Sequence, residues 1–330
     1  MNQQKEKILT VENLKVYFNV FPPNAMPWTK PTKLKAVDGV SFDLYAGETL
    51  GIVGESGCGK STLARAIIKM VPAEAGKVMW LGKDLITASK KEMQSARRDL
   101  QMIFQDPLAS LNPRMTIGDI ISEPLKTHYP QMPAAERKQK VKEMLIKVGL
   151  LPNQINRYPH EFSGGQCQRI GIARALILKP RLIICDEPVS ALDVSIQAQI
   201  VNLLMDLQEE MGLSLIFIAH DLSIVQHIST RVMVLYLGNV CEITTSKQLY
   251  ATPRHPYTQA LISAVPIPDP EIEKDKNIIL LEGDLPSPLN PPSGCVFRTR
   301  CPKAQAKCAE LKPELHEAEA FHEVACFYPD

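Results

Sequence analysis

The strongest signal in this 330-residue sequence is the stretch TLGIVGESGCGKS at residues 49–61. Its second part, residues 54–61, fits the pattern G-x-x-x-x-G-K-[ST] of a phosphate-binding loop. Residues 49–53 are typical of a short buried strand, and the apolar spacing after the loop predicts a helix that Pro72 closes. A chance glycine-rich turn is the alternative, but it would explain neither the strand before the loop nor the helix after it.

The residue types of this loop suit the binding of a polyphosphate. Glycines let backbone N–H groups curl around phosphate oxygens, and the start of the following helix adds positive potential. Lys60 is expected to reach the β- and γ-phosphates, and the Ser61 hydroxyl is expected to bind Mg²⁺. We therefore expect the chain to bind a nucleoside triphosphate. The residues expected in contact with it are Gly54, Glu55, Ser56, Gly57, Cys58, Gly59, Lys60, Ser61 and Thr62.

Composition narrows the possible functions. Hydrophobic residues make up 45% of the chain and charged residues 22%, which is an ordinary globular balance. The net charge of +1 gives no general attraction to anionic lipid or to nucleic acid, and we expect no nucleic-acid partner. No apolar run reaches the roughly 18 residues of a membrane span, and the polar start MNQQKEK is unlike a signal peptide. Any link to a membrane is therefore expected to pass through a partner.

Several segments predict strands. Residues 8–20 and 36–45 are expected to form strands that lead into the phosphate-binding loop, with a proline-rich inserted loop between them at residues 21–33. Two short isoleucine-rich runs, at residues 182–185 and 213–219, are typical of fully covered strands in a parallel sheet.

Other segments predict helices and linkers. Apolar residues recur at helical spacing over residues 134–148, inside a region at about 92–159 that is expected to be mostly helical. Proline-studded linkers are expected at residues 265–270 and 286–292.

A pair of carboxylates follows one of the predicted strands, in the sequence LIICDE at residues 182–187. Asp186 is placed to hold Mg²⁺, usually through water. Glu187 is placed beside the γ-phosphate, where it would polarise the attacking water. The alternative interpretation is that the two carboxylates merely lie at a solvated strand end. This alternative is weaker once the phosphate-binding loop is accepted, because that loop requires carboxylates of this kind nearby.

Further motifs, in a fixed order along the chain, resemble those of the ATPase subunits of ABC transporters. Gln105 matches the Q-loop of that family, and SGGQ at residues 163–166 resembles its signature motif. SALD at residues 190–193 resembles the D-loop, and His220 resembles the switch histidine. The resemblance covers about residues 8–265.

This resemblance implies a role for each matching residue. Glu187 and His220 are the expected catalytic residues, with His220 bonded to the γ-phosphate and orienting the water. Gln105 is expected to sense Mg²⁺ and water, so that the expected magnesium site consists of Ser61, Gln105 and Asp186.

The signature motif implies a second ATPase domain. In this family the signature helix completes the nucleotide site of a facing domain instead of its own, with its first amides near the γ-phosphate of the partner's ATP. A serine that only caps a helix is the alternative, and Phe162 stands where leucine is more usual. Because one such domain is encoded here, a homo- or heterodimer is required. The residues expected at this shared site are Ser163, Gly164, Gly165, Gln166 and Asp193.

An aromatic side chain from the N-terminal strands is expected to stack on the adenine, as it does in the family. Phe18 fits that place best, and Tyr17 is the alternative. However, Phe18 also continues an alternating apolar pattern with Leu14 and Val16, which favours a position in the core.

Longer stretches narrow the resemblance to the peptide and nickel importer group. They include RHPYTQAL at residues 254–261, IFQDPLASLNPRMTIG at residues 103–118 and CDEPVSALDVSIQAQ at residues 185–199. With the inserted N-terminal loop, the resemblance is closest to the F-type ATPase subunits of bacterial oligopeptide importers. A dipeptide or nickel importer of the same group is the alternative.

The resemblance implies a peripheral subunit at the cytoplasmic face of the inner membrane. Its expected partners are a related, non-identical ATPase subunit, two membrane-spanning permease subunits and a periplasmic or extracellular peptide-binding protein. A soluble ABC ATPase of DNA repair or translation is the competing class. The repair type carries a long coiled coil, whereas the 53 residues between Gln105 and Pro159 lack sustained heptads. The translation type usually fuses two ATPase domains, so we expect a transport ATPase.

Four of the eight cysteines lie near the C-terminus, with the spacing C-x5-C-x6-C-x17-C. The spacing differs from common zinc knuckles and ferredoxin runs, but four thiolates suit a tetrahedral S₄ site or an iron–sulfur cluster. The resemblance favours a [4Fe–4S] cluster, because related peptide-importer subunits carry one at a similar place. A zinc ion and plain reduced thiols are the alternatives. The expected ligands are Cys295, Cys301, Cys308 and Cys326.

These elements predict an α/β fold. We expect a P-loop NTPase core of the ABC type, an antiparallel β subdomain, an inserted helical subdomain at about 92–160 and a small C-terminal Cys-rich domain. The expected borders are residues 1–265 for the ATPase domain and 266–330 for the C-terminal domain. Expected cofactors are ATP, Mg²⁺ and the cluster.

Overall fold

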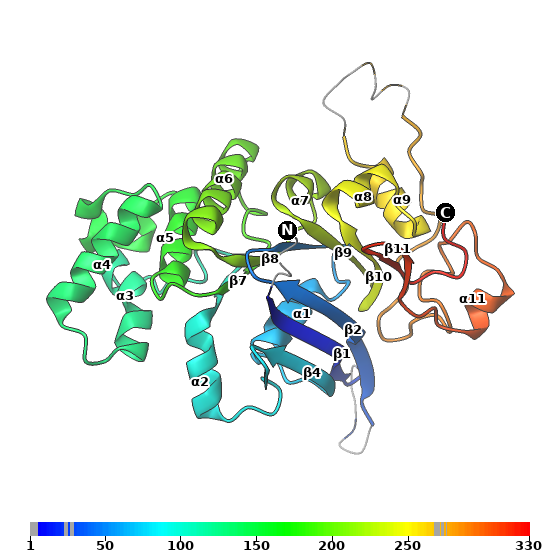
Figure 1. The fold of residues 1–330 in the computed structure, drawn as a ribbon, viewed down its shortest axis with the longest axis horizontal. Coiled ribbons are helices and arrows are strands. Elements are labelled where there is room, and N and C mark those ends of the chain that lie inside the picture. Colours follow the sequence, from blue (N-terminus) through cyan, green and yellow to red (C-terminus); the bar gives the residue numbers. More distant parts are fainter. Residues whose placement is uncertain (1–5, 23–25, 27–29, 267–270, 272–273, 275) are drawn as a thin grey trace. The chain divides into compact units, whose positions relative to one another are not determined.

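The computed structural model describes residues 6–22, 26, 30–266, 271, 274 and 276–330 (Figure 1). These residues form two compact units: unit 1 comprises residues 6, 45–49 and 88–219, and unit 2 comprises residues 7–44, 50–87 and 220–330. The C-terminal region thus packs into the same unit as the phosphate-binding loop. Parts of the predicted loop at 21–33 and of the predicted linker at 265–270 lie outside the described residues.

Unit 1 contains three parallel strands. Strand β6 (Leu100–Ile103) pairs with β7 (Leu182–Asp186), and β7 pairs with β8 (Ser214–Ile218). Every residue of β7 and β8 is buried, so the two apolar runs form the covered parallel strands that the sequence predicts. Strand β6 lies inside the region that was expected to be mostly helical, because its four residues are too few to show a period.

Helices make up most of the rest of unit 1. In Figure 1, α3, α4 and α5 group together, and each of these three contacts the other two. The predicted helix at 134–148 corresponds to α4, which ends at Lys147. The helices of unit 1 are α2 (Lys90–Asp99), α3 (Ile117–His128), α4 (Ala134–Lys147), α5 (Gly164–Leu176) and α6 (Val194–Met211), with short 3₁₀ turns η1 (Pro152–Asn156) and η2 (Pro159–Glu161). None of the helices in the described ranges is long and apolar enough to cross a membrane.

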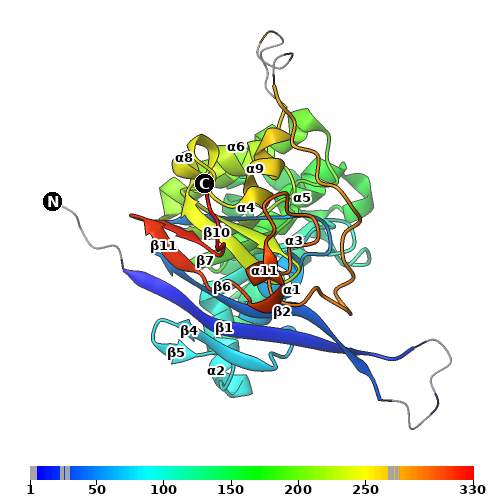
Figure 2. The ribbon, with the colours of Figure 1, turned by 90° about the vertical axis from the view of Figure 1, so that its right-hand side faces the viewer.

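Unit 2 contains an antiparallel sheet in the order β2-β1-β4-β5, shown edge-on in Figure 2. Its strands are β1 (Lys7–Val20), β2 (Thr32–Tyr45), β4 (Ala75–Trp80) and β5 (Lys83–Asp84). The two long strands match the predicted ones, although β2 begins four residues before the predicted start at residue 36. The register of β1 against β4 shifts between Glu12 and Lys15, where Asn13 has a φ of 46°.

The second sheet of unit 2 places the C-terminal region beside the core. Strand β3 (Thr49–Val53) runs parallel to β9 (Arg231–Tyr236), and β9 is followed outward by β10 (Asn239–Thr245), β12 (His322–Val324) and β11 (His316–Glu319), all in antiparallel pairs. The helices of this unit include α1 (Lys60–Ile67), α7 (Leu222–Ile228), α8 (Ser246–Ala251), α9 (Pro256–Ser263) and α11 (Ala306–Glu310). Helix α1 ends before Pro72, earlier than the sequence predicts.

A buried polar group holds β12 to β10. The Nε2 atom of His322 lies 2.6 Å from Oε1 of Glu242, and neither side chain is exposed. The Glu242 carboxylate also accepts hydrogen bonds from the backbone N–H groups of Arg254 (2.8 Å) and His255 (2.9 Å). A buried carboxylate is costly without partners, and these three contacts satisfy Glu242; the one with His322 links β12 to β10.

Burial of His255 predicts a loss of stability in acid. Burial lowers the pKa of His255 to about 3, and its Nδ1 atom accepts the N–H of Tyr257 at the start of α9. Because the folded-state pKa lies below the ordinary value, the unfolded chain binds the proton first, and stability falls as the pH drops below about 6.5. We expect a loss of about 2 kcal/mol between pH 7 and pH 5 from this residue.

Thermal unfolding at the two pH values checks this expectation. The variant His255→Asn keeps an oxygen acceptor for the N–H of Tyr257 but cannot take up a proton. Its melting temperature should fall less between pH 7 and pH 5 than that of the wild type. Equal falls in the two proteins would show that His255 does not contribute to the acid sensitivity.

Candidate nucleotide site

The phosphate-binding loop of unit 2 takes a conformation that requires its glycines. Gly54 has a φ of 150°, and a Cβ added there would lie 2.2 Å from the carbonyl oxygen of Leu235. Gly59 has a φ of 104°, and its added Cβ would lie 2.1 Å from the carbonyl oxygen of Ala36. At both positions the backbone of another strand or loop occupies the place of a side chain, so the close approach and the positive φ each select glycine.

Lys60 is buried and folds back over the loop. Its Nζ donates to the carbonyl oxygens of Gly54 (2.7 Å) and Glu55 (3.1 Å). The side chain therefore already points into the concave side of the loop, where a phosphate would exchange for these carbonyls. Ser61 and Thr62 follow, half-buried, in the first turn of α1, while Ser56 and Gly57 form the exposed tip of the loop.

Cys58 fills the inner side of the same loop. Its side chain is 1% exposed, and burial raises the pKa of its thiol. Its carbonyl oxygen accepts the N–H of Gly238 at 2.8 Å, which joins the loop to the turn between β9 and β10. Cys58 therefore contributes to the packing under the loop, with its thiol turned away from solvent.

Glu55 is held from outside the loop, a feature that the sequence analysis missed. Both oxygens of its carboxylate accept hydrogen bonds from Nη1 of Arg300, at 3.0 and 2.9 Å. Its backbone N–H donates to the hydroxyl of Tyr257 at 3.0 Å. Tyr257 belongs to the quoted stretch RHPYTQAL, but Arg300 lies 245 residues from Glu55, and no local pattern could have linked them.

The two candidate aromatic side chains of β1 differ in their surroundings. The hydroxyl of Tyr17 donates to Asp38 at 2.5 Å, and the ammonium groups of Lys33 and Lys35 lie 5.7 and 5.9 Å from the centroid of its ring. Phe18 is 39% exposed, whereas Leu14 and Val16 are buried. The alternation that favoured a core position for Phe18 therefore stops before it, beyond the register shift of β1.

Gln105 and Glu187, two candidate residues of unit 1, are hydrogen-bonded to each other near the end of β7. Asp186, the last residue of β7, is fully buried, and Glu187 follows it with a φ of 46°. The Nε2 group of Gln105 donates to Oε2 of Glu187 at 2.9 Å, and the N–H of Glu187 donates to the carbonyl oxygen of Ile218 at 3.1 Å. A positive φ at a non-glycine residue is costly, and here backbone and side-chain bonds together fix the direction of the Glu187 carboxylate.

The signature-like residues form the exposed start of α5. The hydroxyl of Ser163 accepts the N–H of Gln166 at 3.3 Å, and the Gln166 side chain accepts the N–H of Ser163 at 3.0 Å, a complete capping box. Ser163 and Gly164 are exposed, whereas Gly165 is buried against Ile196 of α6, with room for no side chain. The start of this 13-residue helix thus presents backbone donors to its surroundings.

Asp193 and His220 stand at the starts of two further helices. Asp193 is exposed at the N-cap position of α6, in unit 1, next to Val194, which is 80% exposed. His220 is exposed in unit 2 and directly precedes the cap of α7, where Asp221 accepts the N–H groups of Ser223 and Ile224. His220 thus follows β8 closely, and Asp193 precedes α6.

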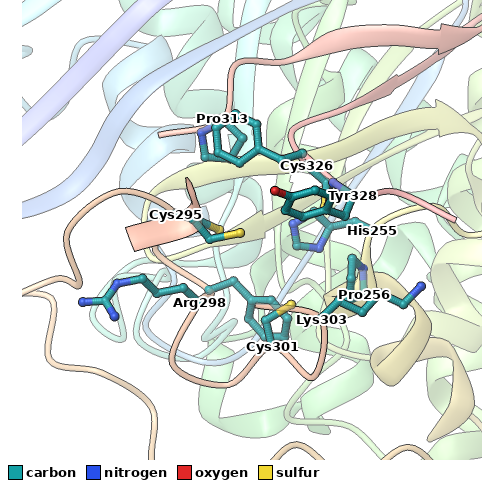
Figure 3. A pocket seen from close by; sticks show the side chains of 12 residues that line it. His255, Pro256, Cys295, Arg298, Cys301, Lys303, Pro313, Cys326 and Tyr328 are labelled. Atoms are coloured by element: carbon teal, nitrogen blue, oxygen red, sulfur yellow. Dashed lines mark hydrogen bonds between the residues drawn. The ribbon is translucent and has the colours of Figure 1, made fainter. Parts of the chain in front are cut away.

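The four C-terminal cysteines line one cavity, together with His255 (Figure 3). In Figure 3, Cys295, Cys301 and Cys326 surround the cavity, and the side chain of Arg298 extends away from it. Burial raises the pKa of the thiols of Cys295 and Cys301, and it raises the pKa of Cys326 to about 11. The donor set therefore suits a thiolate-bound group, which would have to displace protons on binding.

Among the described residues, no group of three or more histidine, cysteine, aspartate or glutamate side chains is arranged to hold a metal ion. The structure therefore agrees with the expected metal centre in one respect, which is that the four cysteines line one cavity.

Two known families match parts of this chain. The ABC transporter family matches residues 37–190. The family described as the oligopeptide/dipeptide transporter, C-terminal region, matches residues 241–308, which include Tyr257 and Arg300.

Curated relatives are similar along the whole chain. The oligopeptide transport ATP-binding protein OppF of Haemophilus influenzae is 65% identical over 99% of this chain and 98% of its own length. OppF of Escherichia coli is 64% identical over 100% of this chain and 98% of its own length. The oligopeptide transport ATP-binding protein AppF of Bacillus subtilis is 54% identical over 98% of this chain and 97% of its own length.

Solved structures share the fold. The dimeric ATP-binding cassette MJ0796 in a post-hydrolysis state, bound to ADP and Pi, has a TM-score of 0.63 and 28% identity, and covers 72% of this chain and 99% of that one. The protein cbiO1 from Clostridium perfringens, part of the ABC transporter complex cbiONQ, has a TM-score of 0.63 and 27% identity, and covers 75% of this chain and 92% of that one. The similarity therefore extends to the fold as well as to the sequence.

Proposed function

The chain belongs to the ATP-binding subunits of ABC transporters, and on that premise we propose that it hydrolyses ATP to drive the import of oligopeptides. One observation carries the proposal: the phosphate-binding loop and the oligopeptide-type C-terminal region lie in one chain that matches oligopeptide transport ATP-binding proteins along its whole length. The expected reaction is the conversion of ATP and water to ADP and phosphate, coupled to transport.

The phosphate-binding loop supplies the contacts to the polyphosphate. Backbone N–H groups of residues 54–62 surround the β-phosphate, and Lys60 leaves its carbonyl partners to bind the β- and γ-phosphates. Ser61, Gln105 and Asp186 would hold Mg²⁺, because they carry hydroxyl, amide and carboxylate oxygens of the kind that this ion prefers. Phe18 stacks on the adenine, because its ring is exposed while that of Tyr17 is engaged with Asp38.

Glu187 and His220 carry the chemistry. Glu187 accepts the proton of the attacking water, in an orientation that its hydrogen bond from Gln105 sets. His220 bonds the γ-phosphate and holds the water in line. Gln105 thus connects the carboxylate of Glu187 to the helical part of unit 1, so that a movement there would change the position of the base.

The exposed start of α5 needs a partner. We propose that Ser163, Gly164, Gly165 and Gln166 complete the ATP site of a second, related ATPase subunit, and that Asp193 lies at the same junction. Two permease subunits and a peptide-binding protein would complete the importer, with this chain as a peripheral subunit at the cytoplasmic face of the inner membrane.

Transport by the assembled complex tests the proposed function. The subunits encoded with this chain are purified together, placed in lipid vesicles and supplied with ATP inside and the binding protein with a labelled oligopeptide outside. We expect peptide uptake that depends on ATP and on this chain. If the vesicles took up only nickel or only dipeptides, the chain would belong to a nickel or dipeptide importer instead. ATP hydrolysis without any transport would contradict the proposal.

We propose that the C-terminal domain, residues 266–330, carries a [4Fe–4S] cluster on Cys295, Cys301, Cys308 and Cys326, following the ATPase domain at residues 1–265. The support is that all four thiols line one cavity, and four cysteine thiolates are the usual ligands of such a cluster. When bound, such a group would supply cross-links that order this segment. The residues themselves provide four thiolate donors and an apolar wall.

Metal analysis of anaerobically purified protein tests this assignment. We expect about four iron and four sulfide per chain in the wild type, and far less iron in Cys301→Ser. The matched control is Cys167→Ser, since Cys167 is buried in α5 and its thiol donates to the carbonyl oxygen of Pro159. About one zinc per chain instead of iron would indicate an S₄ site. A folded protein without metal, or unchanged iron in Cys301→Ser, would contradict the cluster.

A further inference from the structure

The segment between Cys295 and Cys301 packs against the phosphate-binding loop within unit 2. Phe297, within this segment, is 1% exposed. The ring of Phe297 stands edge-on to that of Tyr236 in β9, with centroids 5.2 Å apart, and lies 5.3 Å from that of Tyr257 in α9. Aromatic contacts of this kind fix the segment firmly, because each ring buries a large apolar area in a defined geometry.

Arg300, next to Cys301, extends from this fixed segment to the loop. Its bond to both carboxylate oxygens of Glu55 is well shielded from water, with the two side chains 11% and 26% exposed. Exposed ion pairs contribute little to stability, but a shielded pair with two short hydrogen bonds is stronger and more directional. The Arg300 side chain is therefore suited to hold Glu55 in one position.

Glu55 is the residue at which the loop leaves the core. It follows Gly54, whose positive φ starts the curl, and its carbonyl oxygen is one of the two that bind Nζ of Lys60. Tyr257 holds the N–H of Glu55 while Arg300 holds its carboxylate. The C-terminal region thus fixes both ends of a residue whose backbone also determines the place of Lys60.

We propose that Arg300 is a positioning residue of the nucleotide site, and that the Cys295–Cys301 segment acts through it to set the affinity for nucleotide. This inference rests on the proposed ATP-binding function. Arg300 does not touch the phosphates in this arrangement. It acts through Glu55, by keeping the loop in the curled form that accepts a polyphosphate, so its loss raises the cost of ordering the loop on binding.

Nucleotide affinity of the full-length chain tests the proposal. The probe is a fluorescent N-methylanthraniloyl derivative of ATP with Mg²⁺, and the variant is Arg300→Gln. Arg298→Gln is the matched control, since Arg298 lies in the same segment but donates to Ser293, just before it, and not to the loop. We expect about a tenfold rise in Kd for Arg300→Gln and less than a twofold change for Arg298→Gln. Equal affinities in the two variants would overturn the proposal.

Two further readouts separate positioning from general loss of structure. The double variant Glu55→Gln with Arg300→Gln should have the same Kd as each single variant, because all of them break the same contact between Arg300 and Glu55. If the effects of the two changes on Kd were fully additive, Arg300 would not act through Glu55. In the assembled ATPase, Arg300→Gln should raise KM for ATP with kcat nearly unchanged, and Arg300→Lys should recover part of the affinity. A wild-type chain that does not bind the probe would refute the proposed function instead.

Discussion

Replacing Glu187 by glutamine is expected to reduce ATP turnover by at least about a hundredfold while ATP still binds. An amide has nearly the shape of the carboxylate but cannot accept the proton of the attacking water. The structure leads us to expect that turnover is lost while ATP binding is kept. Glu187 is held by its backbone bond to Ile218 and by the side chain of Gln105, and glutamine can keep both of these contacts. The bound but unhydrolysed ATP should then stabilise the pair of ATPase subunits.

Two measurements check this result. Turnover is measured on the complex of this chain with its related ATPase subunit, and subunit association is measured by size-exclusion chromatography with Mg²⁺ and ATP. Glu210→Gln is the control, since Glu210 makes an exposed ion pair with Lys147 in the same unit and should change neither quantity. Full hydrolysis by the Glu187→Gln protein would show that another group accepts the proton.

The sequence was sufficient where neighbouring residues determine the structure. Strand β3 has the predicted bounds, because five consecutive buried residues are followed directly by Gly54, whose positive φ ends the strand. Ser163 caps α5 as its sequence predicts, since a cap and its partner Gln166 lie three residues apart. Each of these features depends on a few adjacent positions, which a motif records completely.

Features that depend on distant residues could not be predicted in this way. Strand β6 has four residues, and only its pairing with β7, some eighty residues later, makes it a strand. The hydrogen bonds of Glu55 to Arg300 join residues 245 positions apart, and an arginine beside a cysteine has no pattern that reveals its partner. Phe18 is exposed although Val16, two residues earlier, is buried; the pairing of β1 with β4 ends at Lys15, and alternation alone does not show where such pairing ends.

Gly59→Ala should have the second large effect, on both stability and nucleotide binding. The added Cβ would meet the carbonyl oxygen of Ala36 at 2.1 Å, and an L-residue rarely adopts the φ of 104° found there. Because the neighbouring atom is backbone and cannot rotate away, the loop has to move. We expect a loss of about 3 kcal/mol or more in the free energy of unfolding. A loop displaced by about 1 Å should also bind nucleotide at least about a hundredfold more weakly.

Gly57→Ala provides a control within the same loop. Gly57 also has a positive φ, of 78°, but an added Cβ there would meet no atom within 4 Å. Backbone strain alone should then cost about 1 kcal/mol in protein without nucleotide. Chemical unfolding of both variants without nucleotide separates the two contributions, and binding of the fluorescent ATP derivative follows for the folded proteins. If Gly59→Ala were no less stable than Gly57→Ala, the contact with Ala36 would not be what selects glycine, and the curled loop would owe its form to backbone conformation alone.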